Sequence, residues 1–209
     1  MQYTDLIKGV NVYATGNQNR GNDFPSTPYG KTERDYLDTQ TSDPLGERVY
    51  RFLKKWNRRV AVERNSLEES LQKISSINLP SHIILSDLEN IELRKQIKDT
   101  FETICSVVKY TGASKALHVF QPRLFIMWDD AIRKGYGCHS NAEGYLNFLW
   151  RSKLELQEVV ATYSQCSGGQ VNDMNILQEI ERKLYVDGWK PITKLLDEYN
   201  FAKYTKKWI

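Results

Sequence analysis

The chain has few cysteines, few histidines and no long apolar run. Its 209 residues include three cysteines (Cys105, Cys138, Cys166) that lie far apart without a CxxC pair. This predicts neither a disulfide framework nor a zinc knuckle or iron–sulfur cluster. No apolar run is long enough to cross a bilayer. The N-terminus, MQYTDLIKGV, lacks the basic segment and apolar core of a secretory signal. We therefore expect a cytoplasmic protein with no membrane contact and no metal cluster.

Phosphate-binding loops and zinc sites are also missing from the sequence. The segment TGNQNRGNDFP near the N-terminus has neither the GK[ST] ending of a P-loop nor the GxGxxG order of a dinucleotide fold. Cys138 and His139 are adjacent, but two neighbouring ligands without a second pair make a poor zinc site. We therefore expect no cofactor and no bound metal.

The charge balance is only mildly basic, with 29 basic and 26 acidic side chains, a net charge of +3 and a pI of about 8.6. Such a balance permits a nucleic-acid partner without requiring one. Two runs mix basic and aromatic residues, RFLKKWNRR (51–59) and KYTKKW (203–208). These residue types bind phosphates and stack on bases, which makes Lys54, Lys55 and Arg58 candidate nucleic-acid contacts. The alternative is a solvated helix face for the first run and a trailing C-terminus for the second.

Hydrophobic residues make up 40% of the chain, enough for one globular domain. Residues 14–43 are rich in Gly, Asn, Thr and Pro without a sustained period, which is typical of a long loop. Residues 1–13 fit either a strand or a helix. We therefore predict an N-terminal arm or long loop over 1–43 and a helical domain over 44–209. The fold class is all-α, a single multi-helix domain of about seven or eight helices.

Caps and stops set the expected helix boundaries. Asp43 before Pro44 predicts the first start, and the capping boxes Ser66/Glu69 and Ser140/Glu143 predict two more. Further starts are expected at Ser86 or Asp87, at Asp173 and at Pro191, and stops at Gly112, at 167–169 and at Gly188. Apolar side chains at helical spacing form the expected core: Val49, Phe52, Leu53, Trp56, Leu67, Leu71, Ile74, Ile97, Phe101, Ile104, Val108, Tyr145, Phe148, Leu149, Leu156, Val160, Ile176, Leu177, Ile180 and Leu184.

The segment TGASKALHVFQPRLFIMWDDAIRKGYG (111–137) places groups that are costly to bury inside an apolar run. Lys115 is expected in the first turn of a short helix that Ser114 caps and Pro122 ends. Asp129 or Asp130 is expected to cap the next helix. Two short helices joined in this way bring Lys115 within possible reach of an aspartate.

A half-buried amine beside a carboxylate has a specific chemical use. Burial disfavours the charged form, so the pKa of the lysine falls and its amine becomes nucleophilic. A carboxylate can orient the amine or stabilise a cationic intermediate, which suits attack on an electrophilic sugar carbon followed by Schiff-base chemistry. His118 lies on nearly the same helical face as Lys115. It is either a proton shuttle near neutral pH or a core histidine with its hydrogen bonds satisfied.

The stretch GASKALHVFQPRLFIMWDDAI resembles the helix-hairpin-helix DNA glycosylase superfamily, particularly the oxoguanine-glycosylase-like proteins. The resemblance covers residues 111–137. It implies that Thr111–Ser114 form the hairpin, so that Thr111, Gly112 and Ser114 contact nucleic acid. It also implies that Lys115 is the nucleophile and Asp129 or Asp130 the catalytic aspartate. A flipped DNA base would then sit among aromatic side chains, with His118 or Trp128 lining the pocket.

A second interpretation is a non-catalytic helical binding or scaffold protein. In it Lys115 extends to water, the aspartates only cap a helix, and Phe125, Met127 and Trp128 are core. The surroundings of Lys115 distinguish the two. An enzyme requires Lys115 to open onto a cleft with a carboxylate near its amine, whereas a scaffold allows it to lie in solvent. Neither the substrate nor the oligomeric state follows from the sequence.

Overall fold

Eight α-helices and no strand make up the part of the chain that the computed structural model describes, residues 1–18, 43–56, 61–77, 79, 84–167, 173–184 and 190–209. The all-α prediction is confirmed for these residues. No helix among them is long and apolar enough to cross a membrane. The elements are α1 (Tyr3–Gln18), α4 (Leu45–Trp56), α5 (Arg64–Ser76), the 3₁₀ turn η2 (Leu85–Glu89), α6 (Ile91–Phe120), α7 (Asp130–Gly135), α8 (Ala142–Ser167), α9 (Asp173–Lys183), α10 (Ile192–Asn200) and the π-helical turn η3 (Phe201–Thr205).

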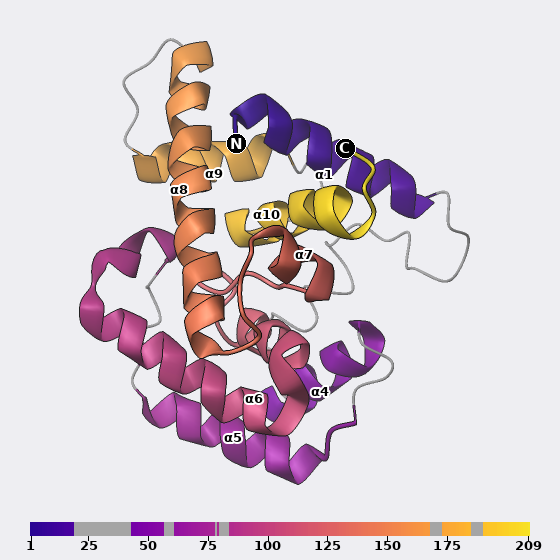
Figure 1. Ribbon diagram of the computed structural model, residues 1–209, viewed down its shortest axis with the longest axis vertical. Coiled ribbons are helices and arrows are strands. Elements are labelled where there is room, and N and C mark those ends of the chain that lie inside the picture. The colour runs from indigo at the N-terminus through magenta and orange to yellow at the C-terminus, as the bar shows by residue number, and fades with distance from the viewer. Residues whose placement is uncertain (19–42, 57–60, 78, 80–83, 168–172, 185–189) are drawn as a thin grey trace.

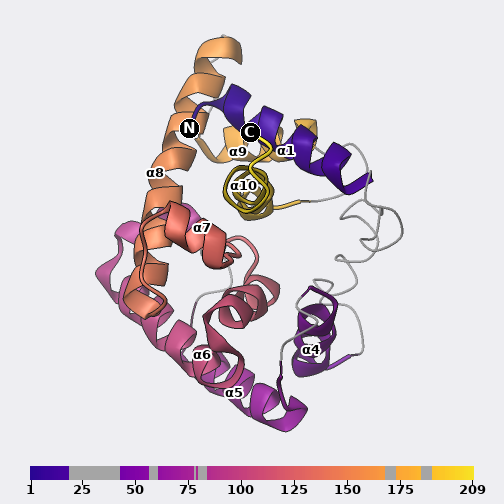
Figure 2. The ribbon, with the colours of Figure 1, turned by 45° about the vertical axis from the view of Figure 1, so that its right-hand side comes forward.

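The helices form two groups that the long helix α8 connects (Figures 1 and 2). Helices α4, α5 and α6 pack on one another and are called the lower layer. Helices α1, α9 and α10 form the upper layer, in which α10 contacts both of the others. Helix α8 contacts α6 below and α1 and α9 above. The short helix α7 lies between the layers and packs against η3, the direct continuation of α10.

The apolar periodicity predicts the core well. Most of the expected core residues are buried: Val49, Phe52, Leu53, Leu67, Leu71, Ile74, Ile97, Phe101, Ile104, Val108, Tyr145, Phe148, Leu149, Leu156, Val160, Ile176 and Ile180. Leu177 and Leu184 are partly buried and pack against this core. The side chain of Trp56 lies outside the described residues.

Three helix starts differ from the prediction. Helix α5 begins at Arg64, so Ser66 lies inside it and donates a hydrogen bond to Glu63 (2.8 Å) instead of capping. The cap of α6 is Asn90, whose Oδ1 accepts from the N–H groups of Glu92 (2.9 Å) and Leu93 (3.2 Å). At α8, the Oδ1 of Asn141 accepts from the N–H of Gly144 (2.8 Å). Asparagine caps as well as serine does, and Asn90 and Asn141 take the cap positions at α6 and α8.

The first part of the segment predicted as an N-terminal arm or long loop is helical, which is one of the two alternatives for residues 1–13, and the helix extends into the predicted loop as far as residue 18. Residues Tyr3–Gln18 form α1, which packs on α10 and α8. Leu6 and Val10 are buried, and a side chain at Gly9 would meet Tyr199, whose Cα lies 3.1 Å from the Cβ position. The apolar face and this close approach of α1 to α10 explain why the segment is helical. Residues 19–42 of the predicted arm lie outside the described residues.

Candidate active site around Lys115

Lys115 lies in the second part of α6, beyond a break in the helix. Lys109 has φ 57° and ψ 170°, so the helical course stops there and resumes after it. The Lys115 side chain keeps partial exposure, whereas its neighbours Ala116 and Leu117 are fully buried. Burial lowers the pKa of the Lys115 amine and the charge of Lys194 lowers it further, while the carboxylates of Asp197 and Asp129 act in the opposite direction. The charges that act on Lys115 therefore come from α10 and from the residue before α7.

Asp129 caps α7, as the sequence predicts. Its Oδ1 accepts from the N–H of Ile132 (2.9 Å) and its Oδ2 accepts from the hydroxyl of Thr205 (2.6 Å). The second bond fixes η3 to the N-terminus of α7, which joins two segments far apart in the sequence. Both carboxylate oxygens of Asp129 therefore have structural partners, although its charge still acts on Lys115.

Asp130 points away from this arrangement. It forms ion pairs with Arg133 (2.6 Å) and Lys134 (2.8 Å) of its own helix, and its side chain is 49% exposed. Hydrogen bonds from Lys134 and Arg133 lower the pKa of Asp130 to about 2. Of the two predicted aspartates, Asp129 is the one whose charge acts on Lys115.

His118 and Trp128 belong to the core. The carbonyl of Phe125 can only accept, so the Nδ1 of His118, 2.8 Å away, carries the proton. Burial lowers the pKa of His118 to about 4, which keeps the ring neutral near pH 7. Trp128 donates from Nε1 to the carbonyl of Tyr110 (3.2 Å) and packs on Tyr145. Both side chains are sealed from solvent, which does not suit a shuttle or pocket wall that must touch a substrate.

The hairpin predicted over Thr111–Ser114 is not present, and Gly112 does not end the helix. All four residues are helical, and the break lies at Lys109, which has a positive φ that Gly112 lacks. Gly112 and Ser114 are buried, so only Thr111 of the three predicted nucleic-acid contacts keeps some exposure. Ser114 does not cap; its hydroxyl accepts from the N–H of Trp128 (3.2 Å) and so ties α6 to the segment before α7.

The two basic runs lie in different parts of the molecule. Lys54 and Lys55 are on α4, which packs on α5 and α6 in the lower layer; Arg58 lies outside the described residues. The run 203–208 covers η3 and the chain after it, and Thr205 in this run is the partner of Asp129. The C-terminal run is therefore the one that contacts Asp129.

Helix α10 supplies the part of the site that the sequence does not reveal. All of its residues are buried. Lys194 is paired with Asp197 (2.7 Å) and lies 3.9 Å from Glu198, and Glu198 is paired with Lys190 (2.6 Å). Charges spaced three and four residues apart on a helix are typical of a solvated surface, so the pattern alone gives no signal that these groups are buried.

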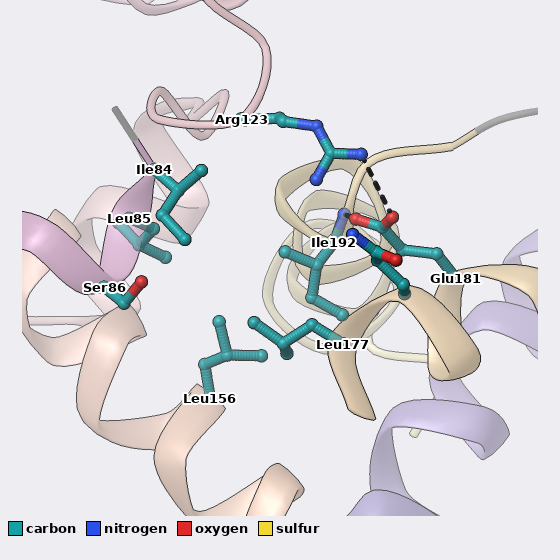
Figure 3. A pocket seen from close by; sticks show the side chains of 9 residues that line it. Ile84, Leu85, Ser86, Arg123, Leu156, Leu177, Glu181 and Ile192 are labelled. Carbon is teal, nitrogen blue, oxygen red and sulfur yellow. Dashed lines mark hydrogen bonds and ion pairs between the residues drawn. The ribbon is translucent and has the colours of Figure 1, made fainter. Parts of the chain in front are cut away.

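A small cavity lies elsewhere, between η2, α8 and the junction of α9 with α10 (Figure 3). Its volume of about 20 Å³ has room for about one water molecule. Glu181 on its wall accepts from the N–H of Ile192 (2.8 Å) and pairs with Arg123 (3.4 Å), and burial raises the pKa of this carboxyl. This cavity is too small for a nucleotide.

No group of His, Cys, Asp and Glu side chains among the described residues could hold a metal ion. Within the same part of the chain Cys105 and Cys138 are free thiols. No known protein family, curated protein or solved structure matches this chain. The chemistry of the Lys115 surroundings is therefore the basis for assigning a function.

Proposed function

We propose that the protein binds DNA and uses the Lys115 amine to attack the C1′ carbon of an abasic or damaged nucleotide. The observation that carries this proposal is the amine of Lys115, which burial desolvates although the side chain keeps partial exposure, so that its pKa is lowered. Desolvation is one of the conditions that make a lysine amine nucleophilic near neutral pH.

DNA as the partner is supported by the resemblance of residues 111–137 and by the charges around the site. Lys134 and Lys207 are exposed, and Lys203 and Lys206 are partly exposed. All four lie on α7 or in the C-terminal run that Thr205 ties to Asp129. Lysines beside a reactive group can hold the phosphates that flank a target nucleotide.

The chemistry begins with the ring-opened aldehyde of an abasic site. The neutral amine forms a bond to C1′, and the electron pair of the carbonyl moves to oxygen, which takes up a proton. The resulting carbinolamine expels its hydroxyl as water, and the nitrogen lone pair forms the iminium. Loss of a C2′ proton then breaks the C3′–O bond and cleaves the strand.

A non-catalytic binding or scaffold protein is the second candidate. Asp129 favours it, because both oxygens of this carboxylate already have structural partners. Ser114, His118 and Trp128 likewise have hydrogen bonds that a scaffold would use. This candidate gives Lys115 no covalent role.

Borohydride trapping tests the proposal. The protein is incubated with duplexes carrying an abasic site or 8-oxoguanine, and borohydride reduces any iminium to a stable amine. We expect an adduct with the wild type and with Lys95→Ala, which removes an exposed lysine, but not with Lys115→Ala. An adduct that survives Lys115→Ala would contradict the assignment of the nucleophile. Absence of any adduct with folded wild-type protein would favour the scaffold.

A further inference from the structure

We infer that a groove between α1 and the C-terminal segment binds an unpaired base of single-stranded DNA, while neighbouring lysines contact the phosphates. The groove has a volume of about 410 Å³, and ligand sites in proteins typically measure about 300–1,000 Å³. The choice of DNA rests on the proposed function, but the groove does not use the Lys115 amine. Five residues line it: Asn11, Val12, Thr15, Gly16 and Trp208.

The C-terminal segment turns back after η3 and places Trp208 on α1, and both views show the C-terminus against this helix (Figures 1 and 2). Lys207 has φ 56°, a left-handed conformation that glycine normally supplies at the end of a helix. The N–H of Trp208 then donates to the carbonyl of Ala202 (2.9 Å). A side chain at Gly16 would collide with the indole, because its Cβ would lie 2.5 Å from Cη2 of Trp208. The unusual turn and the missing side chain together position the indole beside the groove.

Trp208 provides a flat surface on which a base can stack. Its ring makes an edge contact with Phe201, with 6.4 Å between the centroids and 74° between the planes. Trp208 is partly exposed and lines the groove, so part of its surface faces the open volume whatever else the ring contacts. Every base has an aromatic face, and stacking on a protein ring therefore needs no particular base sequence.

Asn11 adds a group that can hydrogen-bond to the edge of a stacked base. It is exposed on the turn of α1 before Thr15, and its side-chain amide has no hydrogen-bond partner in the part of the chain that the structure describes. An amide carries one acceptor and two donors, and the edges of unpaired bases present both kinds of group. The groove thus offers a stacking surface and a hydrogen-bonding group on neighbouring walls.

The charge around the groove favours a polyanion. Lys8 lies one turn before Asn11 on the same face of α1, and Lys207 directly precedes Trp208. Both lysines are exposed, and neither has an ion-pair partner among the described residues. Asp5 is the one acidic side chain in α1 and residues 201–209. Lysines beside a stacking aromatic are the combination that single-strand binding uses, whereas a proline-rich peptide, which also docks in aromatic grooves, has no phosphates for them to contact.

A matched pair of variants on α1 tests the groove. Fluorescence anisotropy measures the binding of a labelled oligothymidylate that carries no lesion. Thr15→Glu places an anionic side chain in the groove, whereas Ala14→Glu adds the same charge at an exposed neighbour that does not line it. We expect Thr15→Glu to weaken binding about 5- to 150-fold, the effect of losing one stacked base, and Ala14→Glu to stay much closer to the wild type. Equal affinities of the two variants would overturn the inference.

Trp208 itself is tested by comparing Trp208→Ala with Trp208→Phe, with circular dichroism to check that each variant is folded. The alanine variant removes the stacking surface and is expected to lose affinity over the same range, about 5- to 150-fold. The phenylalanine variant keeps an aromatic ring and is expected to retain most of the affinity. Equal loss in two folded variants would contradict stacking on this residue.

The salt dependence of binding tests the lysines separately from the stacking. We expect Lys8→Gln and Lys207→Gln each to reduce the slope of log K against log salt by about 0.7, the value for one phosphate contact on a single strand. Lys95→Gln, which removes an exposed lysine of α6, is the control with an unchanged slope. Slopes that stay at the wild-type value in both groove variants would overturn the phosphate contacts.

Failure of the groove is distinguishable from failure of the proposed function. The oligothymidylate has neither an aldehyde nor a damaged base, and Lys115→Ala is expected to bind it like the wild type. Binding without any borohydride adduct would refute the lysine chemistry alone, and an adduct together with normal binding by Thr15→Glu would refute the groove alone. Absence of binding by the folded wild type, or binding of a labelled polyproline peptide in place of DNA, would overturn the inference.

Discussion

Helices α5 and α10 both carry acidic and basic side chains but have opposite surroundings. In α5 the buried residues lie on one face, Leu67, Ser70, Leu71 and Ile74, and the charged side chains point outward. In α10 every residue is buried, with Lys194, Asp197 and Glu198 inside the molecule. In the upper layer α1 and α9 pack on α10, and η3 continues α10 toward α7 (Figure 2). The same sequence pattern can therefore describe a surface helix or a central one.

The buried ion pairs of α10 also distinguish the upper layer from the lower layer. Removing a charge from water costs several kcal/mol per ion, and replacement of a buried ion pair by apolar residues is often neutral or stabilising. The pairs of α10 are therefore weak as devices for stability. The Oε2 of Glu198 even has no hydrogen-bond partner among the described residues. The charges of Asp197 and Lys194 in this cluster also act on Lys115.

The largest expected effect comes from removing one member of the buried pair in the upper layer. Glu198→Ala leaves the charge of Lys190 without its partner at 2.6 Å, and we expect a loss of about 3–5 kcal/mol in the free energy of unfolding. Urea unfolding followed by circular dichroism measures it. The double variant Lys190→Met/Glu198→Leu removes both charges and is expected to cost much less. Equal costs for the single and double variants would contradict this account.

In the lower layer the corresponding change is a cavity in an apolar core. Leu71 on α5 is buried, so we expect Leu71→Ala to lower the free energy of unfolding by about 3 kcal/mol. The adjacent Gln72 is exposed, and Gln72→Ala is the matched control with an expected change of about 0.5 kcal/mol or less. A Leu71→Ala variant as stable as the control would show that the lower layer is not the apolar core.

The lower layer is the part of the fold that the sequence predicts best. Leu67, Leu71 and Ile74 follow helical spacing. The buried face of such a helix can therefore be recognised from the local sequence. The helix end predicted at Gly112 is wrong, because the break lies at Lys109. A glycine permits a left-handed conformation, but the chain takes that conformation at Lys109, a choice that depends on how the two parts of α6 pack.

The candidate site is predictable only in part for the same reason. Asp129 is expected from its position as a cap, and Lys115 from its apolar neighbours. The charges of Lys194 and Asp197 act on Lys115 although they are far from it in the sequence, and no local pattern predicts this. Pairing between distant segments, as in Thr205 with Asp129, is a property of tertiary packing.

The buried residue His118 of α6 is expected to make the stability of the protein depend on pH. Burial lowers its pKa to about 4, so below its ordinary value of about 6.5 the unfolded chain takes up a proton that the folded chain does not. Stability therefore falls as pH falls from about 6.5 to about 4, by about 1.4 kcal/mol for each pH unit. Urea unfolding at pH 7 and pH 5.5 is compared between wild type and His118→Asn, which keeps a donor for the carbonyl of Phe125.

We expect His118→Asn to reduce the loss of stability between pH 7 and pH 5.5 by about 1 kcal/mol. His139→Asn is the control, because His139 is exposed and its side chain is solvated in both states. The same slope in wild type and His118→Asn would mean that His118 is not the group that titrates.

The smallest effect is expected at Lys109, where the lower-layer part of α6 meets the part that carries Lys115. With φ 57° and ψ 170°, this residue occupies a region that costs a side chain roughly 1–3 kcal/mol. Lys109→Gly removes the strain but adds about 0.5–1 kcal/mol of backbone entropy cost, so we expect a net gain of about 1 kcal/mol. Lys109→Ala keeps Cβ and is expected to stay close to the wild type, since the lysine side chain is exposed. If urea unfolding gives the same stability for the glycine and alanine variants, the break between the two parts of α6 is held without backbone strain.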